Sequence, residues 1–189
     1  MSTAFVTLSL TFVLAVIVQQ DDALANLQQR ANSGDVSAQM FLGAYYDQKK
    51  SDPAKAFVWF AKSAAQGDPD AQYSLGQLYE DGRGVPQDYS LAAAWYRVAC
   101  ENRPDYGGAG EGCNSLAILY EEGKGVPKSA VKAYMYYAIQ DERWARDALA
   151  NRITDAEIAE AKRNLAVWRV RHPDVDSSQA PPSHSGDCH

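Results

Sequence analysis

The sequence predicts an all-α fold, an α/α solenoid of about three helix-turn-helix repeats with capping helices at both ends. One observation is a near-duplication: LYEDGRGVPQD at 78–88 recurs 41 residues later as LYEEGKGVPKS at 119–129. A second is that apolar residues recur at helical spacing on both sides of each of these segments. A repeated unit that cannot bury its apolar face alone is typical of stacked repeat proteins.

Three copies of the unit align on a residue pair in the first helix of each copy: Leu42-Gly43, Leu75-Gly76 and Leu116-Ala117. A Tyr follows each pair at a fixed offset, and after the turn an Ala precedes an aromatic residue by three positions. These residues are Tyr46, Tyr79 and Tyr120, then Ala56 and Trp59, Ala92 and Trp95, and Ala133 and Tyr136. Copy 1 has a shorter turn, and an insertion at 103–112 precedes copy 3.

The Gly-x-Gly of the duplicated segment suits a turn better than a phosphate-binding loop. Gly82 and Gly123 follow the last periodic residue of a helix, where a left-handed C-cap favours glycine. The following Pro residues, Pro86 and Pro127, prevent the first helix from continuing. The second helices then begin after residues suited to N-capping, namely Asp52, Asp88 and Ser129. A phosphate loop would need a preceding strand and a Lys-Ser/Thr pair after the glycines, and the sequence has neither.

The pattern resembles the Sel1-like repeat family, a relative of the tetratricopeptide repeats, over about residues 34–140. The residues that carry the resemblance are best seen in copy 2: Ala71-Gln72, Leu75-Gly76, Leu78-Tyr79, Gly82-x-Gly84-Val85, Asp88, Ala92, Trp95-Tyr96 and Ala99. The resemblance implies a right-handed α-solenoid that binds other proteins and acts as an adaptor. It implies no shared catalytic residues, and neither cofactor nor metal is expected. Copy 3 departs from the pattern, because Gly112-Cys113-Asn114 replaces the Ala-Gln start.

The remaining segments are assigned from their composition. Residues 1–25 are expected to be a signal peptide, because 4–18 are apolar or hydroxylic without any charge and Ala23-Leu24-Ala25 fits a cleavage site. An uncleaved membrane anchor is the alternative. Residues 26–34 are expected to form a capping half-repeat whose helix begins near Asn26, because Asn26 and Gln29 have the spacing of a capping box. The repeats occupy 35–140, capping helices occupy 141–172, and 173–189 are expected to be a disordered tail.

Cysteine usage agrees with export to the periplasm or the medium. Cys100 lies near the end of the second helix of copy 2, and Cys113 lies early in the first helix of copy 3. Neighbouring helices in a solenoid would bring them together, so a disulfide that closes the inserted loop is expected. Two buried free thiols are the alternative, because pairing cannot be read from sequence alone. Cys188 has no evident partner.

The function expected from the sequence is protein binding by a non-enzymatic scaffold in the cell envelope. Net charge is −6, which argues against nucleic acid as the partner. By register in the first helices, six residues could face a partner: Met40, Ala44, Tyr73, Gln77, Asn114 and Ile118. An acidic edge beside the turns would suit a basic partner; it comprises Asp47, Glu80, Asp81, Glu121 and Glu122. The sequence does not predict the oligomeric state.

Two other function classes stay open at this point. Ser129 and Lys132 match the Ser-x-x-Lys of penicillin-recognising enzymes, and some cysteine-rich members of the family are linked to β-lactams, so a β-lactam or cell-wall hydrolase is one alternative. However, Ser129 aligns with the N-caps Asp52 and Asp88, and the companion motifs of those enzymes are missing. An immunity or inhibitor protein that binds a toxin is the other alternative.

Overall fold

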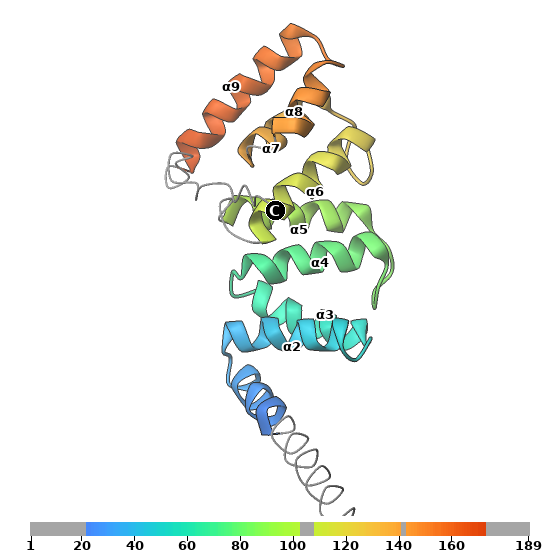
Figure 1. The fold of residues 1–189 in the computed structure, drawn as a ribbon, viewed down its shortest axis with the longest axis vertical. Coiled ribbons are helices and arrows are strands. Elements are labelled where there is room, and N and C mark those ends of the chain that lie inside the picture. The colour runs from blue at the N-terminus through green and yellow to red at the C-terminus, as the bar shows by residue number, and fades with distance from the viewer. Residues whose placement is uncertain (1–21, 103–107, 141–142, 173–189) are drawn as a thin grey trace, which may run out of the picture.

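The computed structural model describes residues 22–102, 108–140 and 143–172, and every regular element in these ranges is a helix. The chain forms a stack of antiparallel helix pairs that runs from helix 22–32 at one end to α9 at the other (Figure 1). The labelled helices are α2 (Val36–Gln48), α3 (Pro53–Ala64), α4 (Pro69–Asp81), α5 (Tyr89–Asn102), α6 (Gly108–Glu122), α7 (Ala130–Ile139), α8 (Arg143–Ala150) and α9 (Asp155–Arg171). The all-α repeat prediction is confirmed.

Each repeat is one helix pair, α2 with α3, α4 with α5, and α6 with α7, and each pair packs on the next. Helices α8 and α9 follow the third pair and pack against α7. The expected apolar segment at 4–18 and the tail at 173–189 lie outside the described residues. None of the helices within the described ranges is long and apolar enough to cross a membrane.

Side-chain caps begin most of these helices as the sequence predicts. Asp52 accepts a hydrogen bond from the Lys55 N–H, and Ser129 accepts one from the Lys132 N–H. Asp88 accepts from the N–H groups of Ser90 and Leu91 at the start of α5. Thr154 and Glu157 form a complete capping box at α9. These bonds satisfy donors that the first turn of a helix leaves free.

The N-terminal cap differs from the expectation. Residues 22–32 are one continuous helix, so Asn26 lies inside the helix and does not cap its start. Packing holds this helix against the first repeat, because Leu24, Leu27 and Ala31 belong to a cluster that includes Leu42 and Trp59. The periodicity of these apolar residues extends upstream of Asn26, and that signal outweighs the capping-box spacing.

Within each of the first two repeats an aromatic ring from the second helix lies against a glycine of the first. The Phe60 ring covers Gly43, and a Cβ on that glycine would lie 2.5 Å from Phe60 Cδ1. The Tyr96 ring covers Gly76 in the same way. The small residue therefore allows the two helices to approach until the ring fills the space between them, which explains the Leu-Gly pairs in copies 1 and 2.

The turn glycines also serve the stacking between repeats. Gly82 is the left-handed C-cap of α4, with φ 68°. Gly84 has φ 73°, and a Cβ there would lie 2.5 Å from the carbonyl carbon of Pro53 in the preceding repeat. Gly125 meets the backbone of Tyr89 in the same way, and its carbonyl accepts a hydrogen bond from Ser90 Oγ. The second glycine of each turn is thus required by the neighbouring repeat as well as by its own backbone conformation.

Candidate protein-binding surface

The first helices present one recurring outer face, here called the first-helix face. It contains four positions per helix at spacings of three and four residues, all half-buried or exposed. These are Ser37, Met40, Phe41 and Ala44 on α2, Asp70, Tyr73, Ser74 and Gln77 on α4, and Glu111, Asn114, Ser115 and Ile118 on α6. The opposite side of each helix contributes to the core.

All six residues expected to face a partner lie on this face, though to different extents. Met40 and Ala44 are half-buried because they also pack against a core cluster between the first two repeats. Asn114 is half-buried, and Ile118 is 38% exposed. The face therefore supplies apolar contact area without being part of the fully buried core.

Tyr73 and Gln77 form the polar centre of the face. The Tyr73 hydroxyl accepts a hydrogen bond from Gln77 Nε2 at 3.0 Å and is also hydrogen-bonded to Ser115 of α6. Burial and the negative charge of Glu111 raise the pKa of Tyr73, so the hydroxyl stays protonated. Tyr73 thus joins two neighbouring first helices and holds its ring in a fixed position.

Phe41 is the most exposed large apolar residue of this face, and the sequence interpretation missed it. Its side chain is 63% exposed, next to Met40 on α2. The aligned positions in the next two repeats are Ser74 and Ser115, so an aromatic residue where the other copies have Ser was the available signal. Exposed aromatic side chains are frequent anchors in protein interfaces.

The acidic edge is internally paired. The pairs are Asp47 and Asp81 with Arg83, Glu80 with the Tyr96 hydroxyl, Glu121 with Arg152 and the Tyr137 hydroxyl, and Glu122 with Lys124. Each carboxylate therefore has a partner within the chain. The edge offers a basic partner less free charge than the sequence suggested.

The Ser129 and Lys132 geometry is that of a helix start. Ser129 Oγ is 3.3 Å from the Lys132 backbone N–H, which it caps. Lys132 Nζ lies over the ring of Tyr120, 4.9 Å from its centroid. The amine is thus engaged by an aromatic face, and Lys55 lies over Tyr46 in the same way in the first repeat.

Cys100 and Cys113 are joined by a disulfide, with a Cα–Cα distance of 4.7 Å. Both residues are fully buried. At the aligned positions of the earlier junctions, Gln39 Nε2 donates to the Ala31 carbonyl. Gln72 Nε2 likewise donates to the Ala64 carbonyl. The disulfide therefore replaces a hydrogen bond that ties each repeat to the one before it.

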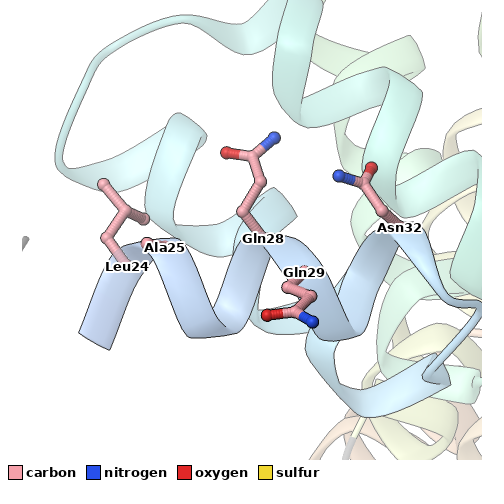
Figure 2. A pocket seen from close by; sticks show the side chains of 5 residues that line it. All are labelled: Leu24, Ala25, Gln28, Gln29 and Asn32. Carbon is pink, nitrogen blue, oxygen red and sulfur yellow. The ribbon is translucent and has the colours of Figure 1, made fainter. Parts of the chain in front are cut away.

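An open groove of about 560 Å³ runs beside helix 22–32. Figure 2 shows the side chains that line it, and three of the five are the amides of Gln28, Gln29 and Asn32. The other two are Leu24 and Ala25. None of these five residues, which are the lining within the described part of the chain, is charged, and the three amides offer hydrogen-bond donors and acceptors.

Comparison with known proteins identifies the repeats. The family model described as Sel1 repeat matches three times, at residues 36–68, 69–103 and 110–139. These matches together cover more than half of the chain. Their boundaries coincide with the three helix pairs α2–α3, α4–α5 and α6–α7.

Two curated relatives each match less than half of this chain. The chitin synthase regulator SKT5 of Saccharomyces cerevisiae is 35% identical over 92 residues, which are 45% of this chain and 13% of that protein. The DAP3-binding cell death enhancer 1 of Rattus norvegicus is 34% identical over 89 residues, 46% of this chain and 18% of that protein. The chain therefore spans less than a fifth of the length of these relatives.

Solved structures show the same architecture. A protective antigen of uropathogenic Escherichia coli that displays an SLR fold superposes with a TM-score of 0.74 at 27% identity, covering 82% of this chain and 34% of that one. A Sel1 repeat protein from Oxalobacter formigenes superposes with a TM-score of 0.53 at 31% identity, covering 77% of this chain and 98% of that one. Sel1 repeat proteins generally mediate protein–protein interactions. The chain belongs to the Sel1 repeat family.

Proposed function

We propose that this protein is an exported scaffold of the cell envelope that binds a protein partner through the first-helix face. The observation that carries the proposal is the exposed Phe41 beside Met40, on a face that recurs in all three repeats. Ile118, which is 38% exposed on α6, supplies a second apolar contact on the same face. Aromatic and aliphatic anchors flanked by polar groups are typical of interface centres.

The partner chemistry that this face suits is a segment with apolar side chains and a basic group. Phe41 and Met40 provide the apolar end on α2. Glu111 on α6 is exposed and provides negative charge at the other end of the face. An apolar contact at α2 together with a cation near α6 would fix both the position and the direction of the bound segment.

Two features support export. The uncharged segment at 4–18 has the length and composition of a signal-peptide core. The disulfide between Cys100 and Cys113 also supports export, because disulfides persist in oxidising compartments and are rare in reducing ones.

The names of two relatives, a regulator of chitin synthase and a DAP3-binding protein, support a role in binding other proteins.

Partner binding by the first-helix face is tested by replacing Phe41 of copy 1 with the residue that the other two copies have at this position. Phe41→Ser introduces the residue found at the aligned Ser74 and Ser115. We expect Phe41→Ser to weaken recovery of a partner from cross-linked envelope extract at least about tenfold, because anchor residues carry much of the binding energy. Val58→Ser is the matched control, since Val58 is 50% exposed on α3, away from the first-helix face. Equal recovery by both variants and the unchanged protein would contradict the proposal.

Export is tested by N-terminal sequencing of the protein from the producing cell. We expect the mature chain to begin at or near Asn26. Because Leu24 packs against the first core cluster, cleavage after Ala25 would remove that contact and leave Leu27 and Ala31 to hold the helix. Recovery of an intact Met1 in the soluble cytoplasmic fraction would contradict export.

A further inference from the structure

Helix α9 has apolar side chains on two opposite sides. One side packs inward: Ala161 and Trp168 are buried, and Ile158 and Leu165 are half-buried. The other side, here called the outer α9 face, is exposed and contains Ala156, Ala159, Arg163, Ala166, Val167 and Val170. Val167 is 53% exposed and Val170 is 81% exposed.

This two-sided pattern is unusual for the end of a solenoid. Terminal caps of repeat proteins have a polar outer face, because that face meets water. An outer face with exposed valines and alanines instead resembles an interior helix, which has neighbours on both sides. Figure 1 shows α9 at the end of the stack, opposite helix 22–32.

The charges around the outer α9 face are divided along the helix. Asp155 and Glu160 lie in its first half. From Lys162 to the end of the helix the charged residues are all cations, namely Lys162, Arg163, Arg169 and Arg171. Among the residues that the structure describes, none of these six side chains forms an ion pair with the rest of the chain, whereas Arg83 and Arg152 are both paired with carboxylates.

A helix with acids at one end and cations at the other is complementary to a reversed copy of itself. We propose that the outer α9 face binds a second copy of this chain, with the two α9 helices antiparallel across a two-fold axis. This charge complementarity favours a second copy of the chain over another partner on this face. The surface is separate from the first-helix face, so the proposal goes beyond the binding function proposed above.

The apolar residues fit an antiparallel register centred on Arg163. In that register Ala156 lies opposite Val170 of the partner subunit, and Ala159 lies opposite Val167 of the partner subunit. Each small residue faces a larger one, so the side chains of the two helices can interdigitate. The two-fold axis repeats every contact, as it does in an isologous dimer.

The same register brings opposite charges together on both edges of the face. At helical periodicity, Glu160 and Arg171 lie on one edge, and Asp155 and Arg169 lie on the other. A two-fold axis between antiparallel helices places like edges against each other. Glu160 therefore meets Arg171 of the partner subunit, and Asp155 meets Arg169 of the partner subunit. Arg163 lies opposite Arg163 of the partner subunit at the axis, and each of these two like charges is within one turn of Glu160 of the other subunit, which offsets their repulsion.

The contact is small, and this sets the strength to expect. One pair of helices buries less than the roughly 1,200 Å² at which stable protein interfaces begin. We therefore expect a weak dimer that forms with rising protein concentration and weakens with salt, because its ion pairs are exposed to solvent.

Sedimentation velocity of the full chain over a range of concentrations tests the proposal. We expect a reversible monomer–dimer equilibrium, and we expect Val170→Glu to raise its dissociation constant at least about tenfold, because the new carboxylate would lie opposite Ala156 and beside the acidic Asp155 of the partner subunit. Val58→Glu is the matched control, because Val58 is also an exposed valine within a helix. Circular dichroism would verify that each variant keeps its helices.

A charge exchange makes the test specific. Arg171→Glu places a carboxylate against Glu160 of the partner subunit, and Glu160→Arg places two cations together, so each change alone should weaken the dimer. The double variant restores opposite charges at both symmetry-related contacts and should recover the dimer. A chain that stays monomeric at all concentrations, a dimer equally sensitive to Val58→Glu, or a double variant no tighter than the single ones would overturn the proposal.

Discussion

Cys113 is bonded to Cys100 at the repeat junction where the two preceding junctions use a buried Gln and a backbone carbonyl. The third junction follows the insertion at 103–112, of which residues 108–112 form the start of α6. Gly112 adds to the close approach, because a Cβ there would lie 3.0 Å from the Tyr96 carbonyl oxygen of α5. A covalent bond therefore holds the position at which a hydrogen bond suffices elsewhere.

The disulfide should contribute substantially to stability. Replacement by Cys100→Ala and Cys113→Ala should lower the free energy of unfolding by about 3 kcal/mol, because the bond restricts the unfolded chain over this loop length. Cys100→Ala with Cys113→Gln installs the pairing of the earlier junctions and should recover about 1 kcal/mol through one hydrogen bond. Urea denaturation measures both, and equal stability of the two double variants would contradict the equivalence of the junctions.

The pairing itself is checked by mass spectrometry of a non-reduced digest. The linked peptide should join Cys100 to Cys113, since both thiols are buried and their Cα atoms are 4.7 Å apart. Free thiols at both positions, in protein taken from the oxidising compartment, would show that the junction is held without the bond.

Tyr96 and Glu80 form a second tie within the middle repeat. The Tyr96 hydroxyl donates to Glu80 Oε2 at 2.6 Å, and burial followed by this hydrogen bond raises the pKa of Tyr96. Tyr96→Phe keeps the ring on Gly76 but leaves the half-buried Glu80 without this donor, so it should cost about 1–3 kcal/mol. Tyr89→Phe, which removes an exposed hydrogen bond to Gln87, is the control and should change stability by less than about 0.5 kcal/mol. Equal effects in urea denaturation would contradict the role of Glu80.

The turn glycines test the stacking between repeats. Gly125→Ala should be markedly destabilising, because its Cβ would overlap the backbone of Tyr89 in addition to meeting a φ of 67°. Gly34→Ala is the matched control: its φ is 97°, but no atom lies within 4 Å of the added Cβ. Thermal melts should therefore show a larger loss of stability for Gly125→Ala than for Gly34→Ala. The difference should be about 1–3 kcal/mol, which is the usual cost of overpacking. A loss no greater than that of Gly34→Ala would show that only the backbone conformation matters.

The repeat pattern, the caps and the C-cap Gly82 could be predicted from sequence because each depends on local chemistry with a fixed spacing. The pairing of Cys100 and Cys113 could be anticipated because aligned repeats place both at one junction. The partners of the acidic edge could not, since Asp47 meets Arg83 across two repeats and Glu121 meets Arg152 from beyond α8. Phe41 was missed because exposure depends on the packing of neighbouring helices, which periodicity alone does not give.

The capping box at α9 should respond to acid. Hydrogen bonds from the Thr154 backbone N–H and hydroxyl lower the pKa of Glu157. A carboxylate with a lowered folded-state pKa stabilises the fold fully above its unfolded-state pKa, near 4, and that contribution is lost as the pH falls through the folded-state pKa. Glu157→Gln removes the titration, so the stability advantage of the unchanged protein over this variant should shrink below about pH 4.

Melting temperatures between about pH 6 and about pH 3 would measure this difference. Glu101→Gln is the control, because Glu101 is exposed and lies near the end of α5, where it caps no helix start. An advantage over Glu157→Gln that grows on acidification would contradict the assigned sign.

Site-specific photo-cross-linking in the producing cell tests the central claim, that the first-helix face binds a protein partner, most directly. A photoreactive phenylalanine analogue would be placed at Phe41, at Ile118 and, as the control, at Val58, which is exposed on α3. The account predicts that Phe41 and Ile118 yield the same discrete adduct with one envelope protein and that Val58 does not. Adducts from Val58 alone, or no adduct from either position on the first-helix face, would contradict it.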